Sequence, residues 1–554
     1  MAVLFEGDDA AGGVSTAYRM AVGDDFYGTN AEGETDWIAV ILQAGVQYNF
    51  AALGIGAANS GLSDPLITLH GPKGAMLAAD DDGGPGLSAS LTYTANTSGT
   101  YFIEVEALTG RNYSYGRYGL TVTEGALPSF SVDMAAAVLY GEGTSWAATP
   151  GTGITLTWGV RASGPAYDAE GSPTPFIQVT AAQTAAMQTA LANFAQVANI
   201  NFTQVNAGGT TNNATILVGA YDSTSDGAGA YAYFPGYRGI AGDKSAGSID
   251  GDLWINNDSV SQSNLPFGSY DYFVVLHELG HALGLSHPGD YNAAPGVIIT
   301  YQNSAQFVQD SGQYSVMSYF DATDTQPMAP GSYADTLMMF DIYALQELYG
   351  INGTTRANDD TYGFHATVGG AYDFTVNKDP LLCIWDGAGR DTLDLSGFRG
   401  KQTIDLNAGS FSDVGGFKGN LSIAIGCKIE NATGGRGADT IYGNVQGNVL
   451  KGGAGLDILI GGAGNDRMTG GNGADGFVFA AGDGRDRIVD FNKTVDVVSL
   501  NSDLWDGRAL SEAEVLAEFA KLRGGNLVFD FGADELTLVK VSSLAGMVDD
   551  IVLV

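Results

Sequence analysis

The sequence predicts a multidomain protein. Short β-strands build its N-terminal region, helices and strands mix in its middle, and its C-terminal third is a parallel β-roll. Three observations predict this division: residues 277–287 read H-E-x-x-H-x-x-G-x-x-H, a nine-residue glycine-rich pattern repeats from Gly434 onward, and residues 1–125 carry short alternating runs between turn residues. A chain of 554 residues is also too long for one hydrophobic core and suggests about three domains.

Composition narrows the class of function. The formal net charge of -38 argues against nucleic acid or an anionic membrane as a partner. No apolar stretch reaches about 18 residues, so we expect no membrane span. The first residues lack the basic and apolar regions of a signal peptide. Cys383 and Cys427 could form one bridge or remain two buried thiols, and their scarcity favours the thiols.

The motif at 277–287 has the spacing of a hydrolytic metal site. On a helix, His277 and His281 lie roughly 40° apart and face one metal together. His287 can join them only if the helix stops, and Gly284 can adopt the left-handed backbone that stops it. Three imidazoles leave the fourth zinc position open for water, and Glu278 can act as general base on that water. A buried amphipathic helix with incidental histidines is the alternative, but it would not require this spacing.

Together with a second segment, this motif resembles the metzincins and, among them, the serralysins, which are secreted bacterial metallopeptidases. The likeness rests on His-Pro-Gly-Asp-Tyr-Asn at 287–292 and Ser-Val-Met-Ser-Tyr at 315–319. It implies an α+β metzincin catalytic domain over residues 126–350. It also implies that Met317 forms an apolar floor under the histidines and that Tyr319 is a displaceable zinc ligand able to stabilise the oxyanion. A tyrosine packed on the pocket wall is the alternative for Tyr319.

Other elements of the middle region follow from local pattern. Residues 180–199 have helical composition with one apolar stripe, and strand-like runs follow at 201–205 and 215–218. The resemblance makes 251–256 the antiparallel edge strand against which substrate lies extended. Residues 334–349 read as the helix that closes the domain.

The repeats from Gly434 follow the template G-G-x-G-x-D-x-U-x, where U is a large apolar residue. This template is typical of repeats-in-toxin (RTX) proteins and predicts a parallel β-roll whose glycine-rich turns bind Ca²⁺ between successive repeats. The inward apolar residues are Ile441, Leu450, Leu459, Met468 and Phe477. The expected calcium ligands in the repeats are Gly435, Gly437, Asp439, Gly453, Gly455, Asp457, Gly462, Gly464, Asp466 and Asp475. The second repeat departs from the template at Gln446 and Asn448, which predicts a weak site there. A flexible glycine-rich linker would need no such period.

The serralysin resemblance extends the expected calcium-binding region to residues 351–554. It implies further calcium sites before the repeats, held partly by backbone carbonyls, at Arg356, Asn358, Asp360, Asp386, Gly389, Asp391 and Glu430. Asn358 and Asp360 stand where the family has smaller residues. At the end of the chain, two acidic residues precede four apolar residues at 549–554. This pattern resembles a type I secretion signal, and the alternative is that these residues form a final edge strand.

Residues 1–125 resemble the pre-peptidase C-terminal β-sandwich, a module appended to secreted bacterial peptidases. The strand-like runs that carry this likeness are 37–42, 48–50, 65–69 and 99–105. Asp64 and residues 80–82 could bind calcium, but solvated turn acids are the favoured reading.

These observations predict a secreted, extracellular, monomeric zinc endopeptidase that needs Zn²⁺ for catalysis and Ca²⁺ to fold its C-terminal domain. Its expected partners are protein and peptide substrates, a type I exporter and a proteinaceous inhibitor. The alternative is a catalytically inactive, calcium-dependent surface or binding protein on the same fold. His70 and His365 lie far from the motif and are expected to be incidental.

Overall fold

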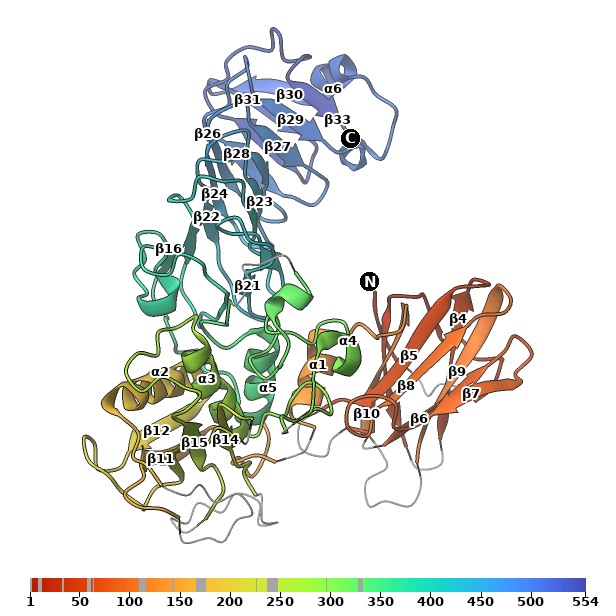
Figure 1. The fold of residues 1–554 in the computed structure, drawn as a ribbon. Helices are drawn as coiled ribbons and strands as arrows, with labels where there is room; N and C mark the ends of the chain where they lie inside the picture. Colours follow the sequence, from red (N-terminus) through yellow and green to blue (C-terminus); the bar gives the residue numbers. More distant parts are fainter. Residues whose placement is uncertain are drawn as a thin grey trace. The chain divides into compact units, whose positions relative to one another are not determined.

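The structure is a computed structural model that describes residues 2–7, 12–31, 34–56, 61–62, 64–108, 116–141, 144–165, 176–225, 227–236, 248–294, 296–326 and 332–554. It divides into two compact units (Figure 1). The first unit contains Met1–Thr325 and Leu337–Asn352, and the second contains Gln326–Thr336 and Gly353–Val554.

Two five-stranded sheets form the N-terminal part of the first unit. One has the order β1-β3-β10-β5-β8 and the other the order β2-β4-β9-β6-β7. The strands of the first sheet are β1 (Val3–Phe5), β3 (Asp25–Asn30), β10 (Gly116–Glu124), β5 (Gln47–Gly54) and β8 (Ala89–Thr94). Those of the second are β2 (Arg19–Met20), β4 (Thr35–Leu42), β9 (Gly99–Ala107), β6 (Pro65–His70) and β7 (Met76–Asp80). The two-residue period of their apolar positions sends alternate side chains to one face, and both sheets contribute to one buried core.

A third five-stranded sheet supports the middle of the chain, with the order β12-β11-β13-β15-β14. Its strands are β11 (Ile154–Val160), β12 (Ile200–Gln204), β13 (Ile216–Tyr221), β14 (Ala230–Ala232) and β15 (Leu253–Asn256). Four of these strands run parallel, and β14 runs antiparallel to β15.

The edge strand of this sheet differs from the prediction. Residues 251–256 were expected at the antiparallel edge, but β15 lies inside the sheet between β13 and β14, and all four of its residues are buried. The antiparallel edge is β14, Ala230–Ala232. A three-residue strand has too few positions to show an alternating pattern, so sequence reasoning passed over it.

Helices of the described first unit are α1 (Val132–Leu139), α2 (Ala181–Val197), α3 (Tyr270–Ala282), α4 (Tyr301–Ser304) and α5 (Met339–Tyr349), with a 3₁₀ turn at Ala322–Asp324. The helix expected at 180–199 is α2, and Thr180 is its N-cap in a capping box with Gln183. The helix expected at 334–349 begins only at Met339. The Asp341 carboxylate accepts the Met338 N–H at 2.9 Å and so defines that start.

Two parallel stacks dominate the second unit. One sheet has the order β16-β18-β22-β24-β26-β28-β32-β31-β30, the other β19-β23-β25-β27-β29-β33, and a small sheet has the order β17-β21-β20. The strands are β16 (Thr361–Gly363), β17 (Leu382–Ile384), β18 (Thr392–Asp394), β19 (Thr403–Asp405), β20 (Phe411–Ser412), β21 (Leu421–Ile423), β22 (Asn431–Thr433), β23 (Thr440–Tyr442), β24 (Val449–Ala454), β25 (Ile458–Ile460), β26 (Arg467–Asn472), β27 (Gly476–Phe479), β28 (Arg485–Ile488), β29 (Val497–Leu500), β30 (Ala520–Arg523), β31 (Asn526–Asp530), β32 (Glu535–Leu538) and β33 (Ile551–Leu553). Helix α6 (Glu512–Phe519) and 3₁₀ turns at Gly370–Tyr372 and Ser502–Trp505 complete it.

Consecutive repeats contribute strands to alternate sheets, so residues that pair are two repeats apart. Ile441 pairs in register with Leu459, which pairs with Phe477, while Leu450 pairs with Met468 in the other sheet. All five side chains are buried, so the apolar position of each repeat lines the interior.

Two further predictions concern the second unit. Cys383 and Cys427 are buried and form no disulfide, which confirms two thiols in place of a bridge. The C-terminal residues 551–553 form β33, which pairs in parallel with β29 at the edge of its sheet. The last residues therefore belong to the folded sheet.

Candidate active site

Helix α3 carries the first part of the metal-binding motif. Ser269 caps it by accepting the Tyr272 N–H at 3.3 Å, and apolar residues such as Leu276 and Leu279 bury its inner face. The helix ends at Ala282, and Gly284 takes a φ of +97°. A Cβ at Gly284 would lie 2.3 Å from the Thr144 carbonyl oxygen, so both the backbone conformation and the space require glycine.

The reversal at Gly284 returns His287 to the two helical histidines. The Nε2 atom of His287 lies 3.2 Å from that of His277 and 3.0 Å from that of His281. The Nδ1 atoms of the helical pair lie 2.8 Å from the Val316 carbonyl oxygen and 2.7 Å from that of Leu285. A carbonyl can only accept, so these Nδ1 atoms hold the protons and each Nε2 presents a lone pair.

Burial keeps all three imidazoles neutral. It lowers the pKa of His277 to about 4 and that of His287 to about 3, and it also lowers the pKa of His281 well below its usual range. Three neutral nitrogens whose lone pairs converge within hydrogen-bonding distance repel each other unless a cation lies among them. The donor set therefore fits a zinc ion with an open fourth position.

Glu278 is buried next to these ligands. Burial raises the pKa of its carboxyl group to about 8, and a hydrogen bond from the backbone of Ala232 opposes that rise. Ala232 belongs to the edge strand β14, so the carboxylate lies beneath the strand along which an extended peptide can pair.

The turn at 315–319 packs against the helix that carries the first two histidines. The Met317 side chain is fully buried, and a Cβ at Gly280 would lie 2.4 Å from its sulfur, so the turn packs directly on α3. Asp341, in α5, fixes the turn by accepting from the Ser315 hydroxyl at 2.6 Å and the Val316 N–H at 2.8 Å.

Sequence reasoning missed Asp341, although the turn depends on it. It also missed Asp310, whose buried carboxylate accepts from the hydroxyls of Tyr291 at 2.9 Å and Ser318 at 2.7 Å. The Tyr291 ring in turn stacks on the His287 ring at 5.4 Å. Neither aspartate belongs to a motif or to a periodic pattern in the sequence. Their contacts could therefore be found only from the structure.

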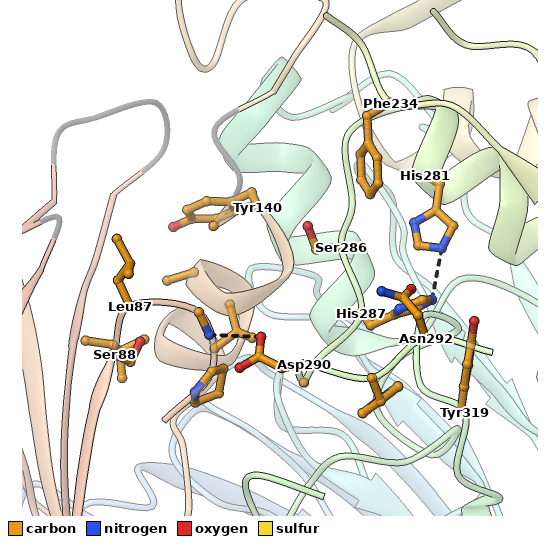
Figure 2. Close-up of a pocket in the computed structure, with 18 of the residues that line it drawn as sticks. Leu87, Ser88, Tyr140, Phe234, His281, Ser286, His287, Asp290, Asn292 and Tyr319 are labelled. Atoms are coloured by element: carbon orange, nitrogen blue, oxygen red, sulfur yellow. Dashed lines mark hydrogen bonds between the residues drawn. The ribbon is translucent and has the colours of Figure 1, made fainter. Parts of the chain in front are cut away.

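Tyr319 lies with its ring centroid 4.4 Å from that of His287. Burial raises the pKa of its hydroxyl to about 12, with the Glu278 carboxylate adding to the effect. The side chain faces a pocket of about 680 Å³ that is also lined by Glu278, His281 and His287 (Figure 2). The hydroxyl is therefore protonated and available as a donor at neutral pH.

The second unit gathers the residues expected to hold calcium before the repeats. Carboxylate oxygens of Asp360, Asp386 and Asp391 lie within 4.8 Å of one another. The Asp391 N–H donates to Glu430 Oε2 at 2.8 Å, and a Cβ at Gly389 would lie 2.2 Å from the Asn358 carbonyl oxygen.

Arg356, expected in the same group, uses its side chain differently. Its guanidinium donates to the Trp385 carbonyl at 2.7 Å and lies 4.4 Å from the centre of the Tyr372 ring. The guanidinium is positively charged, so this side chain cannot be a calcium ligand.

The repeat aspartates form a ladder of buried carboxylates. Asp457 Oδ1 accepts the Asp439 N–H at 2.8 Å, and Asp475 Oδ1 accepts the Asp457 N–H at 3.0 Å. On the other side of the stack, Asp466 Oδ1 accepts the Asn448 N–H at 2.7 Å. The second oxygens of Asp457, Asp466 and Asp475 are buried with no hydrogen-bond partner within the described residues. Orphaned carboxylate oxygens in glycine-rich turns fit Ca²⁺, a hard cation that binds oxygen.

The N-terminal acids that were considered as calcium ligands differ from one another. Asp64 is only 5% exposed, so the favoured reading of a solvated turn acid is wrong for this residue. Asp80 Oδ2 accepts the N–H groups of Gly83 and Ser90, both at 2.8 Å, and so holds a turn. His70 is bound to Glu104 at 2.8 Å and stacks on Trp37, which makes it a structural residue of this sheet.

Comparisons with known proteins agree with this geometry. The Matrixin family model matches residues 168–316, and the family model "Peptidase M10 serralysin C terminal" matches residues 351–537. Metallopeptidase AprA of Pseudomonas marginalis is 42% identical over 406 residues, which cover 70% of this chain and 82% of the relative. Serralysin C of Dickeya chrysanthemi is 38% identical over 365 residues, covering 64% and 71%. Serralysin of Photorhabdus luminescens is 42% identical over 275 residues, covering 49% and 54%.

A solved pre-peptidase C-terminal domain of a collagenase from Bacillus anthracis also matches 19% of this chain and 93% of its own length. Its identity is 17% and its TM-score 0.15, too low to support any argument about fold.

The fold and the site thus define a multidomain metalloendopeptidase of the metzincin class. The chain belongs to the serralysin-type metzincins. In the described part of the chain, every helix is too short or too polar to cross a bilayer.

Proposed function

We propose that this protein is a secreted zinc endopeptidase in which Glu278 is the general base. The observation that carries the proposal is the convergence of three Nε2 lone pairs, from His277, His281 and His287, beside a buried carboxylate. When bound there, zinc supplies Lewis-acid polarisation of the scissile carbonyl and acidifies water at its open position.

The chain's own groups carry the remaining roles. An extended substrate pairs its main chain with β14, which holds the scissile bond above Glu278. The raised pKa of Glu278 falls when a cation is held by the neighbouring imidazoles, because opposite charge favours the ionised carboxyl group. The Glu278 carboxylate then takes the proton of the attacking water and passes it to the leaving amine. The Tyr319 hydroxyl, protonated at neutral pH, donates to the oxygen on which negative charge develops.

Glu278→Gln tests this assignment, with Glu347→Gln as a matched control because Glu347 is an exposed carboxylate in α5 of the same unit. We expect Glu278→Gln to bind zinc but to lose about 10²–10⁴-fold in kcat, while the control keeps the wild-type rate. Peptide hydrolysis and metal content by elemental analysis measure the two effects. A Glu278→Gln enzyme with wild-type kcat would remove Glu278 from the reaction.

We also propose that calcium closes the C-terminal domain after export. The domains in this proposal are residues 1–125, a pre-peptidase-type β-sandwich; 126–350, the catalytic domain; and 351–554, an RTX β-roll with a C-terminal secretion signal. Without Ca²⁺ the orphaned carboxylates of the ladder repel one another, so the chain stays unfolded where free calcium is scarce. Extracellular calcium would then fold it around the ions. Circular dichroism of the full chain during a calcium titration at pH 8 tests this; full β-structure in excess chelator at that pH would contradict it.

A further inference from the structure

The N-terminal sheets are joined to the catalytic part by a connection that is fixed on both sides. Phe130 is buried and stacks on Phe307 at 4.8 Å, and the Gln309 side chain bonds to Ser129 and to the Phe130 backbone. On the other side, the Tyr27 hydroxyl of β3 donates to Asp133 Oδ1 at 2.8 Å. Such a connection holds the sheets in place, in contrast to a flexible tether.

The helix that follows this connection reaches the metal-binding loop. Met134 of α1 packs so closely on β10 that a Cβ at Gly119 would lie 3.0 Å from its Cγ. At the other end of α1, the Leu139 carbonyl accepts the N–H of Ser286, the residue before the third histidine, at 2.6 Å. One helix therefore contacts both the N-terminal sheets and the loop that carries His287.

A turn of the N-terminal part, residues 84–88, also contacts this loop. The Gly84 N–H donates to the Ser88 carbonyl at 2.8 Å, and the Ser88 N–H donates to the Pro85 carbonyl at 3.1 Å, so the turn is closed by its own bonds. The Gly86 N–H then donates to Asp290 Oδ1 at 3.2 Å. Asp290 lies three residues beyond His287 and is held from its other side by Gln306.

These contacts make the N-terminal part a wall of the catalytic pocket. The pocket of about 680 Å³ that contains Glu278 continues past Tyr140 to Pro85 and Leu87. In Figure 2, Leu87 and Ser88 lie at the opposite side of the pocket from His281 and Tyr319. Leu87 leaves 42% of its surface exposed although it is a large apolar side chain.

We infer that the turn at 84–88, with Leu87 at its tip and Tyr140 beside it, forms a distal subsite for an apolar side chain of the polypeptide substrate. The inference rests on the proposed peptidase function and extends it, because the pocket is continuous from Glu278 to Leu87 and β14 lines the same pocket. A peptide long enough to extend from the catalytic residues along this pocket contacts the apolar surface at Leu87. A short peptide that ends beside the scissile bond does not reach it.

The test compares a long and a short substrate with the full-length protein. Leu87→Asp is expected to lower kcat/KM about tenfold for a long peptide or denatured casein, the scale of losing one apolar side-chain contact. The same variant should leave kcat/KM unchanged for a short chromogenic peptide that covers only the residues beside the scissile bond. Leu77→Asp is the matched control, since Leu77 is the same residue type, is 42% exposed and lies in β7 outside the pocket.

Cleavage-site profiling of a peptide library adds a second readout. The wild-type protein should favour an apolar residue at one position away from the scissile bond, and Leu87→Asp should lose that preference. The inference is overturned if Leu87→Asp slows both substrates equally, if Leu77→Asp has the same effect, or if Leu87→Asp speeds the long substrate, which would make the turn an obstruction. A wild-type protein that cleaves neither substrate would instead refute the proposed function, and the subsite with it.

Discussion

Replacing Gly284 by alanine tests how the third histidine is positioned. The residue has a φ of +97°, where an L side chain costs about 1–2 kcal/mol. The added Cβ would also lie 2.3 Å from the Thr144 carbonyl oxygen. That atom is backbone, so no rotamer change relieves the overlap, and overpacking of this kind typically costs a further ~1–3 kcal/mol. We expect a total destabilisation of about 2–5 kcal/mol, which falls on the loop that carries His287.

A matched variant separates the two contributions. Gly208 also has a positive φ, +77°, but a Cβ there would meet nothing within 4 Å, so Gly208→Ala reports the backbone cost alone. We expect Gly284→Ala to weaken zinc binding by more than about tenfold, because 1.4 kcal/mol corresponds to that factor, while Gly208→Ala leaves zinc affinity unchanged. Competition with a chromogenic chelator measures zinc affinity, and urea unfolding measures stability. If Gly284→Ala binds zinc and hydrolyses peptide as Gly208→Ala does, the argument that Gly284 positions His287 is wrong.

Three further outcomes follow from the site and the repeats. Tyr319→Phe should lower kcat about 10²-fold with little change in KM, since it removes a donor used in the transition state. A variant with a raised KM and an unchanged kcat would contradict this role. Asp457→Asn should raise the calcium concentration at the folding midpoint about tenfold in a circular dichroism titration, whereas Asp549→Asn, at an exposed position, should not shift it. Burial raises the pKa of Asp466 to about 7 and that of Asp486 to about 8, so the calcium-free fold takes up protons. In excess chelator this domain should therefore form the most β-structure near pH 4, where these carboxyl groups are protonated, and lose it as the pH rises through 7–8. Circular dichroism in chelator from pH 4 to pH 8 measures this, and β-structure that increases with pH would contradict it.

Local geometry explains why much of the site could be predicted. His277 and His281 are one helical turn apart, and the glycine that ends the helix lies at a fixed distance from both, so the spacing alone indicates one metal site. The ladder of Asp439, Asp457 and Asp475 is predictable for a related reason: the period of the repeats places their carboxylates at equivalent positions of successive turns.

Contacts between distant segments could not be predicted in this way. The edge strand at 230–232 is too short to show a period, and the prediction placed the edge at 251–256 instead. Asp341 supports the turn at 315–319 from a different helix, and nothing in its neighbours indicates that contact. Burial of a single carboxylate against a turn depends on which segments the fold brings together.

By itself, the sequence determined which side chains are candidate metal donors: three imidazoles and a carboxylate within residues 277–287, and a periodic series of aspartates in glycine-rich turns. Both patterns arise from bond geometry over a few neighbouring residues, so they can be recognised without a fold. Only the tertiary structure decided what surrounds those donors, because residues such as Gly86 and Asp290, which are 204 positions apart, meet only after the sheets have packed. That packing forms the walls of the catalytic pocket, and it cannot be inferred from the order of residues in the chain.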